Sequence, residues 1–151
     1  MYGFFLGLHN VTRWLVLFAA VYALYVAYSG WLGKKAYGKE TRRAGMIYAN
    51  VTGVQLILGL LTMFWPGSLI MSVLGNAGFG AAMKNADVRY FLVEHPVIML
   101  VAIGLLHMGT GIARRAPTDE AKYKRLVIFF TIATLLIIVG IPWGRRLLPS
   151  L

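Results

Sequence analysis

Four long stretches without a charged residue constrain the fold of this chain most strongly. They cover residues 14–33, 44–83, 95–113 and 126–144, and short charged segments separate them. A helix needs about 20 apolar residues to cross the hydrocarbon core of a bilayer. Because 59% of the 151 residues are hydrophobic and the mean hydropathy is +0.70, the chain carries more apolar surface than a soluble domain can bury.

These stretches predict a single membrane domain over residues 1–151, an all-α transmembrane four-helix bundle. We expect its helices near 10–32, 44–65, 95–113 and 126–143. The chain has no cysteine, which excludes a disulfide framework, a thiolate metal site and the attachment motif of a c-type haem.

The positive charges cluster in two of the connections. Segments 34–43 and 114–125 each hold five of the fifteen basic residues, against one and two acidic residues respectively. The positive-inside bias then places these connections in the cytoplasm, and both termini with the 66–90 connection on the outer, periplasmic side of a cell inner membrane. Because the charges lie between apolar runs and form no continuous basic face, we expect a lipid bilayer as partner and no nucleic acid.

The 66–90 connection is long and glycine-rich, yet mostly apolar. Two interpretations stay open for it. It is an interfacial helix or a cap lying on the bundle, or it is a surface loop that touches lipid headgroups.

Two histidines are expected at matching depth. His9 lies at the outer end of the first predicted helix and His95 at the outer end of the third, and both helices run from the outer to the inner side. Bundles often hold cofactors between side chains of facing helices, and imidazole is a ligand that suits iron. The pair His9 and His95 is therefore a candidate metal site, with axial haem ligation as its sharpest form. Taken singly, His9 is also readable as an interfacial residue and His95 as a helix-start residue beside Glu94.

Below each histidine runs a stripe of mostly small residues at helical spacing. The two stripes are Arg13, Val16, Ala20, Ala23, Ala27 and Gly30, and Met99, Ala102, Leu106, Gly109 and Ala113. Residues at such spacing share one helix face. Small residues are common wherever membrane helices pack, so the stripes alone favour ordinary packing, and the histidines at their heads favour a flat cofactor.

Arginines on the outer side are candidate partners for haem propionates, since arginine binds carboxylates through two hydrogen bonds. Arg13 lies one turn below His9, and Arg89 and Arg145 are expected on the same side. The alternative for each of them is snorkelling to the interface or pairing with Glu94 or Asp87.

His107 is expected to be separate from this site. Twelve residues place it roughly 18 Å deeper than His95 and about 120° around the helix. Polar groups in hydrocarbon need partners, so a hydrogen bond to Gln55 is the first interpretation. A second ligand or a proton-handling group is the alternative.

The segments LHNVTRW, VEHPVIM and IPW, which begin at residues 8, 93 and 141, resemble those of small four-helix bacterial membrane proteins described as cytochrome b-like. The resemblance covers the layout of the whole chain. It implies a b-type haem and electron transfer, with His9 and His95 as the matching positions.

The leading hypothesis is a b-type haem membrane protein that passes electrons between quinol and an outer-side partner. His9 and His95 would hold the metal, and Arg13 with Arg89 or Arg145 would hold the propionates. The alternative is a cofactor-free accessory or assembly subunit of a larger membrane electron-transfer complex. Quinone, other membrane subunits and a second copy of the chain are the candidate partners, and an electron carrier is favoured over a stand-alone catalyst.

Overall fold

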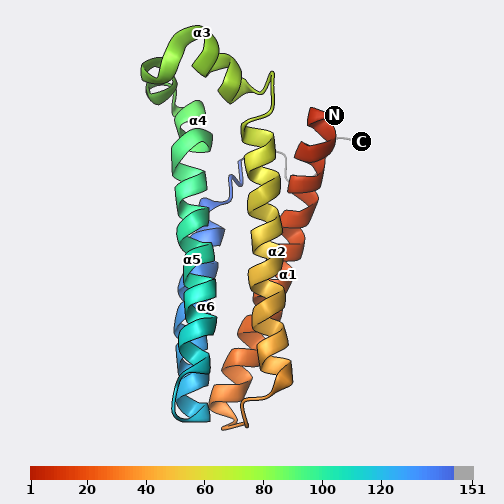
Figure 1. Cartoon of the computed structure of the whole chain (residues 1–151), viewed down its shortest axis with the longest axis vertical. Helices are drawn as coiled ribbons and strands as arrows, with labels where there is room; N and C mark the ends of the chain where they lie inside the picture. Colours follow the sequence, from red (N-terminus) through yellow and green to blue (C-terminus); the bar gives the residue numbers. More distant parts are fainter. Residues whose placement is uncertain (145–151) are drawn as a thin grey trace.

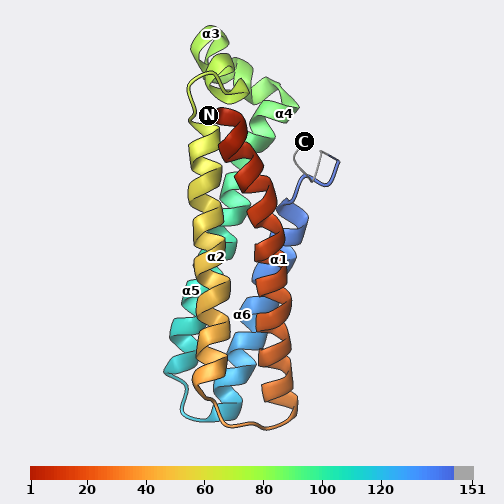
Figure 2. The ribbon, with the colours of Figure 1, turned by 90° about the vertical axis from the view of Figure 1, so that its right-hand side faces the viewer.

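The computed structural model describes residues 1–144. Four long helices lie side by side in an antiparallel bundle (Figures 1 and 2), and each is long and apolar enough to cross a membrane. The described chain therefore confirms an all-α bundle with four candidate spans. These helices are α1 (Tyr2–Leu32), α2 (Lys39–Met63), α5 (His95–Arg114) and α6 (Asp119–Gly140).

Two spans begin earlier than expected. α1 starts at Tyr2 rather than near residue 10, because the apolar segment before His9 continues the helix. The third span starts at Ala86, where α4 (Ala86–Arg89) and the π-helix η1 (Tyr90–Glu94) run directly into α5. His9 and His95 consequently lie about 10 Å and 13 Å inside their spans, at 1.5 Å per residue, instead of at the helix ends.

The four helices form a closed ring. α1 packs on α2 and α6, and α5 packs on α6 and α2, so α1 and α5 are diagonally opposite. The small-residue stripes expected below the histidines face the core of this ring, where Ala20, Ala23, Ala27, Ala102 and Ala113 are each at most 1% exposed.

The outer surface of the bundle is apolar. Phe18, Tyr25 and Val139 are about 70% exposed, and many other large hydrophobic side chains share this exposure. A face of this kind suits contact with lipid hydrocarbon rather than water.

Much of the 66–90 connection is helical. α3 (Leu69–Lys84) lies across one end of the bundle (Figure 1) and contains a kink at Gly78, whose φ of 79° is in the left-handed region. The hydroxyl of Ser68 accepts a hydrogen bond from the Met71 amide, and the side-chain oxygen of Asn85 accepts one from the Val88 amide, so both helix starts are capped. The interpretation as a cap on the bundle is the one that the architecture favours.

The core of the bundle farther from α3 is filled by side chains. Tyr48 is fully buried, contacts Phe130 edge to face, and shares a 2.8 Å hydrogen bond with Thr134. The interior of the bundle is therefore packed here, and the open space of the fold lies elsewhere, toward α3.

Candidate cofactor site

A cavity of about 580 Å³ opens inside the bundle at the end that α3 covers. Its walls come from all four long helices, from the start of α3, and from α4 and η1. Most of the lining is apolar, which is the usual character of a cofactor or ligand pocket of this size. The polar and charged lining residues are Tyr2, His9, Asn10, Arg13, Thr52, Gln55, Thr62, Ser68, Asp87 and His95.

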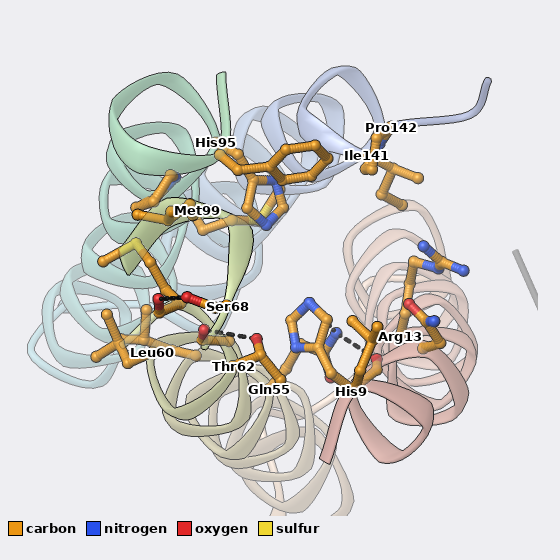
Figure 3. Close-up of a pocket in the computed structure, with 18 of the residues that line it drawn as sticks. His9, Arg13, Gln55, Leu60, Thr62, Ser68, His95, Met99, Ile141 and Pro142 are labelled. Atoms are coloured by element: carbon orange, nitrogen blue, oxygen red, sulfur yellow. Dashed lines mark hydrogen bonds between the residues drawn. The ribbon is translucent and has the colours of Figure 1, made fainter. Parts of the chain in front are cut away.

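His9 and His95 face one another across this cavity from the diagonal helices α1 and α5 (Figure 3). Their ring centroids are 6.4 Å apart and their planes are inclined at 80°. Two imidazoles that bind one metal ion from opposite sides, with metal–nitrogen bonds of about 2.0–2.1 Å, hold their centroids about 6.4 Å apart. The spacing of the two rings therefore matches a shared metal.

The ring of His95 is oriented by the end of α6. Its Nδ1 lies 2.7 Å from the carbonyl oxygen of Gly140, and because a carbonyl can only accept, Nδ1 is the protonated nitrogen. In the neutral imidazole Nε2 then carries no proton and has a lone pair available. Gly140 is the last residue of α6, where carbonyls lack a partner within the helix and the helix dipole is negative.

Glycine at position 140 permits this contact. A Cβ there would come within 2.5 Å of the Met99 Cε and 2.9 Å of the Ile98 Cγ2. The missing side chain lets the end of α6 approach α5 closely enough for its carbonyl to reach His95.

Aromatic side chains of η1 complete the surroundings of His95. The ring of Tyr90 lies 6.0 Å and that of Phe91 6.3 Å from the imidazole, centroid to centroid. The Tyr90 hydroxyl also donates to the Gly140 carbonyl, at 2.8 Å. The Gly140 carbonyl thus accepts from both Tyr90 and His95. Tyr90 and Phe91 belong to the single π-turn η1, and such turns recur at functional sites.

His9 is held differently, from α2. Gly59 lies against its ring, and a Cβ at that position would be 3.1 Å from the His9 Cε1. The Gln55 amide donates to the His9 backbone carbonyl at 2.8 Å and lies 3.4 Å from the His9 Nε2, while its oxygen accepts from the Thr12 hydroxyl. The His9 Nδ1 is buried and has no hydrogen-bond partner within residues 1–144.

The arginines proposed for the site are placed differently from one another. Arg13 lines the cavity and is 8% exposed, and Figure 3 shows its side chain on the side where Ile141 and Pro142 lie. Arg89 is not part of the cavity lining and forms a 2.7 Å ion pair with Glu94. Arg145 lies outside the described residues. Arg13 is therefore the arginine that the described chain brings to the histidines.

His107 does not pair with Gln55. It lies on an exposed face of α5, whereas Gln55 is engaged by His9 and Thr12. The expected hydrogen bond between His107 and Gln55 is absent because position along a span predicts the depth of a residue but not the direction in which its side chain points.

The donor set distinguishes between kinds of metal site. No group of three or more histidine, cysteine, aspartate or glutamate side chains that could hold a metal ion occurs within the described part of the chain. A bare ion would therefore receive two protein ligands, although structural zinc sites use four and catalytic ones three. A metal that already carries four macrocycle nitrogens would need only one or two protein ligands, and His9 and His95 could supply them.

No protein-family model, curated protein or solved structure matches this chain. The functional argument therefore depends on the geometry of the site itself.

Proposed function

We propose that this protein is a b-type haem protein of the cell inner membrane that transfers electrons. The observation that carries the proposal is the 6.4 Å separation of two imidazole rings across a largely apolar cavity of about 580 Å³. The separation suits axial ligation from both sides, and the volume falls within the range of cofactor pockets.

Each residue of the site has a role in this proposal. His9 and His95 would hold the haem iron, and the Gly140 carbonyl fixes the tautomer of His95 that leaves its Nε2 available. Arg13 would bind a propionate carboxylate, since its buried position gives a charge-assisted contact more strength than at the surface. The bound haem would supply one-electron redox chemistry.

The surroundings of the site suit electron transfer rather than substrate turnover. Most of the cavity lining is apolar, and α3 lies across this end of the bundle. We propose quinol in the membrane as electron donor and an outer-side protein as acceptor, because the positive-inside bias puts the capped end on the periplasmic side.

The absorption spectrum of the purified full-length protein tests this proposal. Protein made in cells supplied with haem should be red, with a Soret band that shifts on reduction by dithionite. The double variant His9→Ala/His95→Ala should lack the band. His107→Ala is the matched control, because it removes an imidazole from the same helix on an exposed face, and it should keep the wild-type spectrum.

A second candidate is an accessory or assembly subunit without a cofactor. The observation that favours it is the exposed His107 in the interior of the α5 span, because polar residues within membranes usually contact another protein segment. A colourless wild-type protein from haem-supplied cells would support this candidate and refute the first.

A further inference from the structure

We propose that the two imidazoles of the site are inequivalent. His95 is the permanent ligand, and His9 is an exchangeable ligand whose place can be taken by a small neutral molecule such as a diatomic gas. This inference rests on the proposed haem function and adds a binding activity to it, because a ligand that leaves opens a coordination position.

The contacts of His95 fix its ring. Its Nδ1 donates to the Gly140 carbonyl at 2.7 Å, and the rings of Tyr90 and Phe91 lie within about 6 Å of it, centroid to centroid. A hydrogen bond from the non-ligating nitrogen of a histidine orients the ring and makes the ligating nitrogen more basic. His95 has both advantages, so its bond to a metal should be the stronger.

The contacts of His9 lack this support. Its Nδ1 is buried, and no acceptor for it lies within residues 1–144. The Gln55 amide donates to the His9 backbone carbonyl at 2.8 Å and reaches the ring only through a longer contact of 3.4 Å with Nε2, so the ring is held less tightly than that of His95. When Nε2 binds a metal, Nδ1 carries the proton, and no described acceptor orients the ring or makes Nε2 more basic, as the Gly140 carbonyl does for His95. His9 should therefore be the weaker ligand of the two.

A partner for the departing ring is already in place. The Gln55 amide nitrogen already lies 3.4 Å from the His9 Nε2, within hydrogen-bond distance. Gln55 is itself held by the Thr12 hydroxyl. Once Nε2 no longer binds a metal it can accept from this amide, so Gln55 stabilises the released ring.

The cavity suits a small neutral ligand in the vacated place. Its lining includes Val16, Met99 and Ile103, which favour an apolar molecule. Arg13 is positively charged, and its proposed carboxylate partner would neutralise it. These surroundings select for size and neutrality rather than for charge.

Carbon monoxide is the probe that tests this inference, with haem-loaded full-length protein reduced by dithionite. In the wild type, His9 must leave before carbon monoxide binds, so the observed rate should reach a plateau as its concentration rises. In His9→Ala the rate should rise linearly. The His9→Ala variant should keep its haem, and His95→Ala should bind haem at least about 10-fold more weakly than His9→Ala. His107→Ala, with its substitution far from the cavity, should show the wild-type plateau.

The outcomes separate this inference from the proposed function. Equal loss of haem in the two single variants, or a reduced wild-type protein that binds no carbon monoxide, overturns the inference and leaves the haem function in place. A wild-type protein that takes up no haem overturns both. The carbon monoxide kinetics of the wild type and of His9→Ala together identify the leaving ligand, so they decide the question even where His95→Ala fails to fold.

Discussion

Substituting Gly59 by alanine tests whether the His9 ring occupies the position that the cavity requires. The added Cβ would lie 3.1 Å from the His9 Cε1 and 3.5 Å from its Nδ1. A comfortable contact between carbon atoms is about 3.5–4.0 Å, so the ring would have to move by about 0.4–0.9 Å. A methyl group forced into a packed site typically costs 1–3 kcal/mol.

Without a cofactor the ring can move into the cavity, and the cost is largely avoided. With both imidazoles bound to one metal the ring cannot move freely, so the cost appears as weaker haem binding. Taking the lower half of the range, about 1–2 kcal/mol, we expect Gly59→Ala to weaken haem binding roughly 5- to 30-fold. The loss of haem affinity in Gly59→Ala cannot exceed the loss in His9→Ala, because the added methyl group can at most abolish the bond between His9 and the haem.

Gly53→Ala is the matched control. Gly53 also lies in α2, and a Cβ there would meet nothing within 4 Å. Both substitutions exchange a helical glycine for alanine, which favours the helix by roughly 0.5–1 kcal/mol, so their difference isolates the contact with His9. Titration of the cofactor-free proteins with haem, followed at the Soret band in detergent, gives both affinities. Equal affinities for Gly59→Ala and Gly53→Ala would refute the placement of the ring.

Three further predictions follow from other parts of the structure. Tyr90→Phe removes one of the two donors to the Gly140 carbonyl and should strengthen the remaining hydrogen bond from His95. A potentiometric titration should then show a reduction potential of the bound haem lower by roughly 20–40 mV, and a rise would contradict the assignment. Gly109→Ala puts a Cβ 2.4 Å from the Phe129 Cβ and should lower unfolding stability in detergent by about 1–3 kcal/mol, whereas Gly104→Ala, with open space around it, should not. Because the chain has no cysteine, Asn76→Cys should react with an impermeant maleimide on intact spheroplasts and Lys39→Cys only after permeabilisation, and the reverse pattern would invert the proposed orientation.

The apolar runs were sufficient to predict the four spans, because hydrophobic length is a property of the sequence alone. They could not locate the starts of α1 and of the third span. The residues before His9 are apolar enough to continue a helix, and no capping residue or charge separates them from it. The third span also continues before His95, because its helix runs on through the charged Glu94 and Arg89 to the Asn85 cap. The predicted depth of the histidines was therefore too shallow, although their pairing across the bundle followed from matched position in parallel helices.

Other parts of the site depend on distances that the sequence does not contain. Gly140 and Gly59 matter through close approach to a neighbouring helix, and nothing in their local sequence distinguishes them from glycines in open space. Gln55 was assigned to His107 from depth, and its true neighbours depend on the rotation of α2. The partnership of Tyr90 with the Gly140 carbonyl joins residues fifty positions apart, and only the packed fold brings them together.

The π-helix η1 has a consequence for the shape of the bundle end that α3 covers. A π-turn amounts to an α-helix with one residue inserted, and each residue turns a helix by about 100°. The one extra residue therefore turns α4 and α3, which directly precede η1 in the chain, around the axis of α5. Deleting one residue between 90 and 94 would restore a plain α-helix and turn α3 toward a different side of the bundle. The enclosure of the cavity therefore depends on the number of residues in η1 as much as on their chemistry.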